Sequence, residues 1–235
     1  MLLEICANTY QSAKNAQDAG AHRIELCTEL VLGGITPSYG LIKQVVTNIN
    51  LPVYVLIRPR SGDFCYSDSE FKIMKNDIEL CKKIGCAGIV SGVLNSNKDI
   101  DIERTKILFN SSKPLDFTFH RAFDCVHNPE REFKKLIDIG VKRLLSSGLQ
   151  ATAEKGIKLL KKLHTIGGNK IQIMPGGGIN PTNAPLFKKE GFAEIHASAW
   201  GFIKHDTNLS EFKKPAEKFS DPKIIKEILK ALKHA

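Results

Sequence analysis

The sequence predicts an α/β protein of one domain, a (β/α)8 barrel of the TIM type. Short apolar runs alternate with amphipathic stretches eight times along the chain. The length of 235 residues suits such a barrel, which takes about 250 residues. No linker or change of composition divides residues 1–235, so we expect a single domain. A doubly wound open sheet is the main alternative, but Ala7-Asn8-Thr9 follows the first run in place of a glycine-rich fingerprint, so we also expect no nucleotide cofactor.

Eight apolar runs have the length and the flanking turn residues of buried parallel strands. In chain order, the expected strands are Leu2–Cys6, Arg23–Cys27, Val53–Arg58, Gly88–Val93, Leu115–His120, Arg143–Ser147, Ile171–Met174 and Glu194–Ala197. The amphipathic stretches between and after them predict helices over residues 9–19, 38–49, 68–84, 101–112, 130–139, 152–165, 180–190 and 222–233.

Capping residues mark the ends of these helices. Asp99 or Asp101 opens the fourth helix and Thr152 opens the sixth, and Asn128-Pro129 and Asn180-Pro181 each place a cap before a proline in the first turn. A glycine, which favours the left-handed conformation, follows four of the helices: Gly20, Gly85, Gly140 and Gly191.

The composition excludes several classes of protein. Apolar residues make up 42% and charged residues 25%, which does not fit a disordered chain, a collagen or a coiled coil. The net charge of +9 comes from lysines scattered along the amphipathic stretches, so we expect no nucleic-acid partner. No apolar run reaches the roughly 18–20 residues of a membrane span, and no basic secretory signal opens the sequence. We therefore expect a cytoplasmic protein, away from membranes, whose six cysteines are reduced.

Strand parity places polar side chains inside the barrel. Alternate residues of a strand share a face, and the face toward the helices must be apolar. Leu3 and Ile5 face outward on the first strand, so Glu4 and Cys6 face inward; by the same rule Glu25 and Cys27 face inward on the second. Two neighbouring strands thus carry the same inward pair, 21 residues apart.

Further polar residues end the third, fifth and eighth strands, at the mouth where barrel active sites lie. Arg58 and Arg60 are expected to compensate the buried glutamates, which would otherwise repel each other. A closed ionic plug of Glu4, Glu25 and Arg58 with no other role is the alternative. Two imidazoles, His120 and His196, at the same mouth favour a functional site, because a plug needs no group that titrates near neutral pH.

Three loops offer groups that could hold an anion or orient a side chain. The triplet Gly176, Gly177 and Gly178 precedes a helix and can turn its N–H groups toward an anion. Ser198 lies in the loop after the eighth strand, the usual partner in phosphate-binding barrels. Asp124 is a candidate to pair with the imidazole of His120.

The cysteines at the ends of the first two strands form a candidate metal site. Cys6 and Cys27 are at equivalent depth and could bind one soft ion, and thiolates favour Cu(I) over hard cations. Cys125, in the loop after the fifth strand, is a candidate third ligand.

With these segments in hand, the chain resembles the CutC family of copper homeostasis proteins. The matching stretches are LEIC (3–6), GAHRIELC (20–27), GGITPS (33–38), VLIRPRSGDFCYSD (55–68), TFHRAFD (118–124), MPGGGI (174–179) and EIHASA (194–199). They cover residues 1 to about 200, whereas residues 201–235 diverge. The resemblance implies a TIM barrel, a cytoplasmic location, a homodimer or homotetramer, and a Cu(I) site at Cys6 and Cys27.

Two functions remain open at this point. The first is copper handling, with Cu(I) bound by Cys6 and Cys27 at the barrel mouth. The second is an enzyme that acts on a small anionic or phosphorylated metabolite. In that case Arg58, Arg60, Asp124, the glycine loop, His196 and Ser198 bind the ligand, and Glu4, Glu25 and His120 move a proton.

Overall fold

Eight short runs of buried residues form one parallel sheet in the computed structural model, which describes residues 1–203 and 217–234. The sheet order is β7-β6-β5-β4-β3-β2-β1-β8. The strands are β1 (Leu2–Ala7), β2 (Arg23–Leu26), β3 (Val53–Leu56), β4 (Gly88–Ser91), β5 (Asp116–Phe119), β6 (Arg143–Ser146), β7 (Gln172–Pro175) and β8 (Glu194–Ala197). A parallel bridge between Gly176 and His196 joins the two ends of the sheet. The predicted (β/α)8 barrel is therefore confirmed.

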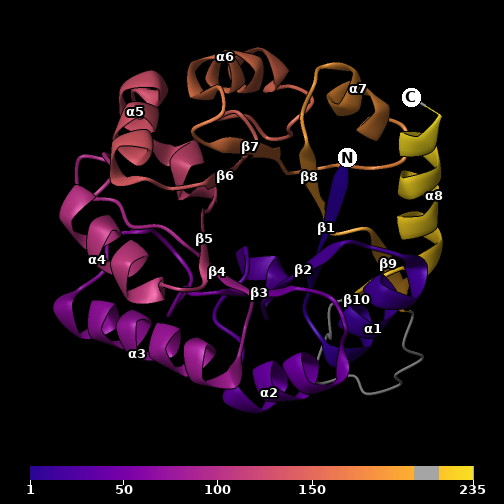
Figure 1. Ribbon diagram of the computed structural model, residues 1–235, viewed down its shortest axis with the longest axis horizontal. Helices are drawn as coiled ribbons and strands as arrows, with labels where there is room; N and C mark the ends of the chain where they lie inside the picture. The colour runs from indigo at the N-terminus through magenta and orange to yellow at the C-terminus, as the bar shows by residue number, and fades with distance from the viewer. Residues whose placement is uncertain (204–216, 235) are drawn as a thin grey trace, which may run out of the picture.

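Helices ring the strands (Figure 1). They are α1 (Tyr10–Ala19), α2 (Tyr39–Asn48), α3 (Asp68–Ile84), α4 (Ile102–Ser112), α5 (Pro129–Ile139), α6 (Ile157–Gly167), α7 (Ala184–Lys189) and α8 (Pro222–Lys233). Each is amphipathic and buries one face against the sheet or a neighbouring helix. Among the described residues, none of the helices combines the length and the apolar character needed to cross a bilayer.

Capping side chains explain where most helices begin. For two helices, the predicted first residue was wrong. Asp101 and Asn128 accept N–H groups of the first turns of α4 and α5 as expected. The helix predicted from residue 152 instead begins at Ile157, because residues 151–156 form bends and turns. The helix predicted from residue 180 begins at Ala184, because the Asn180 side chain accepts the N–H groups of Thr182 and Asn183 and closes a turn there.

Four short elements had no sequence prediction. Two are 3-10 helices, η1 (Leu30–Leu32) and η2 (Arg121–Cys125), in loops after β2 and β5. The other two, β9 (Trp200–Ile203) and β10 (Glu217–Ser220), form an antiparallel hairpin in the part of the chain expected to diverge. Residues 204–216 of that part lie outside the described residues. Helix α8 follows and packs against α1 and α7.

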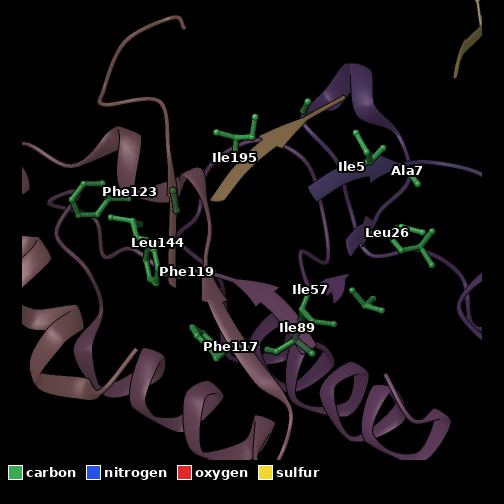
Figure 2. Close-up of a cluster of buried hydrophobic side chains, with 14 of the residues drawn as sticks. Ile5, Ala7, Leu26, Ile57, Ile89, Phe117, Phe119, Phe123, Leu144 and Ile195 are labelled. Atoms are coloured by element: carbon green, nitrogen blue, oxygen red, sulfur yellow. The ribbon is translucent and has the colours of Figure 1, made fainter. Parts of the chain in front are cut away.

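The alternation along the strands separates two apolar cores. Outward side chains such as Ile5, Leu26 and Ile89 belong to the large core between sheet and helices (Figure 2). Inward side chains form a second, smaller core inside the barrel: Cys6, Cys27, Tyr54, Leu56 and Val90. Strand parity thus puts both cysteines inside the barrel.

Gly88 supplies a test of this inner packing. A Cβ added at Gly88 would lie 1.8 Å from ring carbons of Tyr54, so Gly88→Ala should destabilise the protein by about 1–3 kcal/mol. At about 2–4 °C per kcal/mol, the melting temperature measured by circular dichroism should fall by several degrees. The control is Gly40→Ala on α2, where a Cβ meets nothing within 4 Å and a better helix former should leave stability unchanged or higher. Equal melting temperatures for the two variants would contradict the packing described here.

Candidate functional site

A cavity of about 400 Å³ opens at the C-terminal mouth of the barrel. Its volume falls within the range of small-molecule sites, roughly 300–1,000 Å³. The polar side chains and loop glycines that line it are Cys6, Glu25, Cys27, Gly33, Arg58, His120, Arg121, Gly177, Gly178, His196 and Ser198. Its apolar walls are Leu30, Leu56, Phe64, Leu145, Ala151 and Trp200. Most residues singled out from the sequence therefore surround one cavity.

The two thiols lie side by side against one wall. The Sγ atoms of Cys6 and Cys27 are 3.4 Å apart, and both side chains are buried. The hydrogen bond with Cys27, together with burial, raises the pKa of the Cys6 thiol well above its ordinary value. Gly34 packs against Cys27, since a Cβ there would lie 3.5 Å from Cys27 Cβ and 2.8 Å from Leu56. The two cysteines thus form a buried dithiol that lines the cavity.

His196 connects this dithiol to two carboxylates. Its Nδ1 atom lies 2.7 Å from Glu4 and 3.6 Å from Glu25. Burial alone would lower the pKa of His196, but the charges of Glu25 and Glu4 and a hydrogen bond with Cys6 raise it well above its usual value. His196 is therefore a buried cation. Burial raises the pKa of Glu25 to about 7, and no hydrogen-bond partner for its Oε2 atom is found in the described part of the chain.

An ionic floor closes the barrel beneath the cavity. Arg23 forms ion pairs with Glu4 and, at 2.6 Å, with Glu194, and Arg143 pairs with Glu194 at 2.7 Å. Both guanidinium groups also stack on the ring of Tyr54, with centroid distances of 4.8 and 5.4 Å. Burial would raise the pKa of Glu4, yet Arg23 and His196 outweigh it and hold the value at about 2.

This floor corrects the prediction about charge compensation. Arg58 and Arg60 were expected to neutralise Glu4 and Glu25, but Arg23 pairs with Glu4, and Glu25 faces His196. The register pairs Glu4 with Arg23 and Cys6 with Glu25, because β2 is staggered relative to β1. Applying the same parity rule to Arg23 would have placed it inside the barrel. The ionic floor thus shares Glu4 with the expected plug, but Arg23, Glu194 and Arg143 take the places of Glu25 and Arg58, and the cavity lies above it.

Among the described residues, Arg58 forms no ion pair with Glu4 or Glu25, its predicted partners. Its guanidinium donates to the backbone carbonyls of Leu32 and Gly34, at 2.9 and 2.7 Å, and of Gly62 at 2.8 Å. It also lies over the ring of Phe64, 5.0 Å from the centroid. All these contacts are with neutral groups.

His120 packs on the same phenylalanine, with a ring-centroid distance of 5.0 Å from Phe64. Its Nδ1 atom accepts the backbone N–H of Ala122 at 3.2 Å, so the proton is on Nε2, for which the described residues offer no partner. Burial, and then the charge of Arg58, lower the pKa of His120 to about 3. The imidazole is therefore neutral at physiological pH.

Several predicted residues do not line the cavity. Arg60 turns away and pairs with Glu70 at 2.6 Å and with Asp63 at 3.0 Å. Asp124 does not orient His120; it accepts hydrogen bonds from Ser146 and Ser147 and pairs with Arg121.

Three more candidates lie outside the wall of the cavity. Cys125 is exposed at the end of η2, Gly176 forms the strand bridge with His196, and Glu4 reaches the site only through that histidine. The positions of the loop side chains could not be predicted from strand parity, because tertiary hydrogen bonds set the direction in which these side chains point.

Comparison with known proteins gives a consistent set of relatives. The model of the CutC family matches residues 1–201. A CutC family protein of Klebsiella pneumoniae (strain 342) is 44% identical over 205 residues, which is 87% of this chain and 83% of that protein. The human copper homeostasis protein cutC homolog is 44% identical over 199 residues, 84% of this chain and 73% of that protein. The crystal structure of a CutC protein from Streptococcus agalactiae superimposes with a TM-score of 0.79 at 34% identity, covering 84% of this chain and 98% of that one.

The ionic floor should be essential for stability. Arg23→Met would leave Glu4 and Glu194 buried without their shared cation, and breaking a buried pair from one side costs about 3–5 kcal/mol. The matched control is Arg60→Met, whose ion pairs are partly exposed and should contribute about 0–1 kcal/mol. Urea unfolding of both variants measures the difference. A loss at Arg23 no larger than at Arg60 would show that the floor is not needed.

The protonation state of His120 can be observed directly. We expect its imidazole NMR signals to stay constant from neutral pH down to well below the ordinary histidine pKa of about 6.5, because the pKa in the fold is about 3. Comparison with the spectrum of His120→Gln assigns the signals. A titration midpoint near 6.5 would mean that the ring is neither buried nor beside a cation.

Proposed function

The chain belongs to the CutC family, and on that premise we propose that it is a copper-handling protein that binds Cu(I) as cargo between Cys6 and Cys27. The observation that carries the proposal is the separation of 3.4 Å between two sulfurs at the cavity wall. Buried thiols deprotonate when a metal replaces their protons, and a soft monovalent ion matches soft sulfur ligands. The proposal places the protein in the cytoplasm, where the reducing environment keeps thiols free.

The distance between the sulfurs constrains the geometry of the bound ion. With metal–sulfur bonds of about 2.2 Å, slightly shorter than those of zinc, sulfurs 3.4 Å apart enclose an angle of roughly 100° at the metal. Linear coordination would need sulfurs about 4.4 Å apart, an opening of about 1 Å. The bent angle leaves room for a third ligand. His196, which hydrogen-bonds to Cys6, suits that position better than the exposed Cys125 once the bound ion has displaced a proton from its imidazolium ring.

A second candidate function is an enzyme that acts on a small anionic metabolite. The volume of the cavity favours it, because about 400 Å³ exceeds by more than tenfold the roughly 30 Å³ that one water occupies in the liquid. Of the proposed proton carriers, Glu25 suits the role best, since a pKa of about 7 matches proton transfer near neutral pH. Glu4 is fixed in its ion pair with Arg23, which makes it a positioning group for His196.

The copper proposal is tested by Cu(I) competition. Under anaerobic conditions with a coloured Cu(I) chelator, the variant carrying Cys6→Ser and Cys27→Ser should lose affinity on the order of 100-fold or more, because both ligands are gone. Cys125→Ser is the matched control and should bind as the wild type does. X-ray absorption should give two sulfur neighbours at about 2.2 Å. Unchanged affinity in the double variant, combined with loss of small-anion binding in Arg58→Met, would reject copper handling in favour of the second candidate.

A further inference from the structure

Arg58 is a buried cation that no carboxylate among the described residues neutralises. Only 5% of the residue is exposed, and its guanidinium contacts are three backbone carbonyls and an aromatic ring. Among the described residues it forms no ion pair with a carboxylate. A buried charge without a counterion is costly, and such groups are normally paired. The residue is therefore held in place for a negative partner that residues 1–203 and 217–234 do not supply.

The other cations at the cavity already have partners. Arg121 pairs with Asp124 at 2.8 Å, and His196 faces Glu25 at 3.6 Å, whose negative charge favours the cationic imidazole. The ionic floor has two guanidinium groups and two carboxylates, which balance each other. Of the charged groups that line the cavity in the described part of the chain, Arg58 is the one left uncompensated. The unmatched charge at this wall is thus a single positive unit.

His120 adds a hydrogen-bond donor to the same wall without adding charge. Its Nε2–H has no partner among the described residues, and the residue is 5% exposed. The imidazole and the guanidinium of Arg58 contact one ring, that of Phe64, each at 5.0 Å. A neutral donor beside a fixed cation matches a ligand that carries acceptor oxygens and one negative charge.

The rest of this wall is apolar. Leu56, Phe64 and Leu145 line the cavity beside Arg58 and His120, and Trp200 lines it from the hairpin. Apolar lining with a few fixed polar groups is the usual composition of a site for an organic molecule. The ligand should therefore combine an anionic head with a hydrocarbon or aromatic body.

We propose that Arg58 and His120 form a subsite for the carboxylate of a small organic acid whose apolar body lies against Phe64. A carboxylate brings one negative charge and two acceptor oxygens, which this wall matches. A phosphate monoester carries close to two charges and three terminal oxygens, and so would leave a buried charge unmatched. The inference rests on the second candidate function, for which it names the class of ligand, and it is independent of copper binding.

Benzoate is the probe that tests this subsite. Isothermal titration near neutral pH compares it with benzamide, which is neutral and of the same shape, and with phenyl phosphate. Benzoate should bind at least about tenfold more tightly than either, since a hydrogen bond to a charged group contributes about 1.5–3 kcal/mol. Binding of phenyl phosphate as tight as that of benzoate, or no benzoate binding at millimolar concentrations, would overturn the proposal.

Variants separate this subsite from the copper site. Arg58→Met and His120→Leu should each weaken benzoate binding about tenfold or more, whereas His120→Gln, which retains an N–H donor, should recover part of the loss. Arg60→Met is the matched control and should bind as the wild type does, because Arg60 is paired outside the cavity. The double variant of Cys6 and Cys27 should keep benzoate binding even where Cu(I) binding is lost. Equal binding by wild type and Arg58→Met would overturn the proposal.

The subsite can also be tested in the wild-type protein by NMR, so that a substitution that disturbs the fold cannot affect the result. Benzoate added to the wild-type protein should shift the imidazole NMR signals of His120, because the ring donates to the ligand. A constant His120 signal under saturating benzoate would place the ligand elsewhere and reject the subsite.

Discussion

Arg23 lies between the carboxylates of Glu4 and Glu194 in the interior of the barrel, where water cannot take its place. This contact offsets the cost of burying charged groups, because Arg23 keeps Glu4 ionised although the residue is completely buried. The ionised Glu4 in turn holds His196 in its cationic form, and His196 hydrogen-bonds to Cys6. The groups beneath and beside the cavity are therefore coupled: the dithiol is positioned by a chain of charge contacts that starts at one guanidinium.

The sequence predicted the strands best, because side chains alternate along a strand with a fixed period of two residues. Alternation along a strand depends only on the pleat, so the inward positions of Glu4, Cys6, Glu25 and Cys27 follow from their apolar neighbours. The eight strands and the barrel follow from the repeated pattern of apolar runs and caps. Even so, Arg23 was not among the predicted site residues, because an arginine at the start of a strand resembles an exposed end.

In the loops beyond the strand ends, no periodic pattern predicts where a side chain points. Arg60 lies two residues after Arg58, yet its side chain turns toward Glu70 on α3 while Arg58 remains at the cavity. Asp124 follows His120 closely but accepts hydrogen bonds from the loop after β6. The hairpin of β9 and β10 joins segments separated by residues 204–216, so no local pattern predicts the pairing. In each case a partner distant in the sequence decides the conformation.

Copper alone does not account for this interior. An ion between two sulfurs fills a small part of about 400 Å³, and the remaining space is lined by Arg58, His120 and apolar side chains. Unfilled volume and an unmatched buried charge both lower stability, and larger side chains at these positions would remove both costs. Residues that reduce stability without contributing to packing are typical of binding sites, where function opposes stability. The carboxylate ligand proposed for the wall of Arg58 and Phe64 would remove both costs at once, because it brings a counterion and an apolar body.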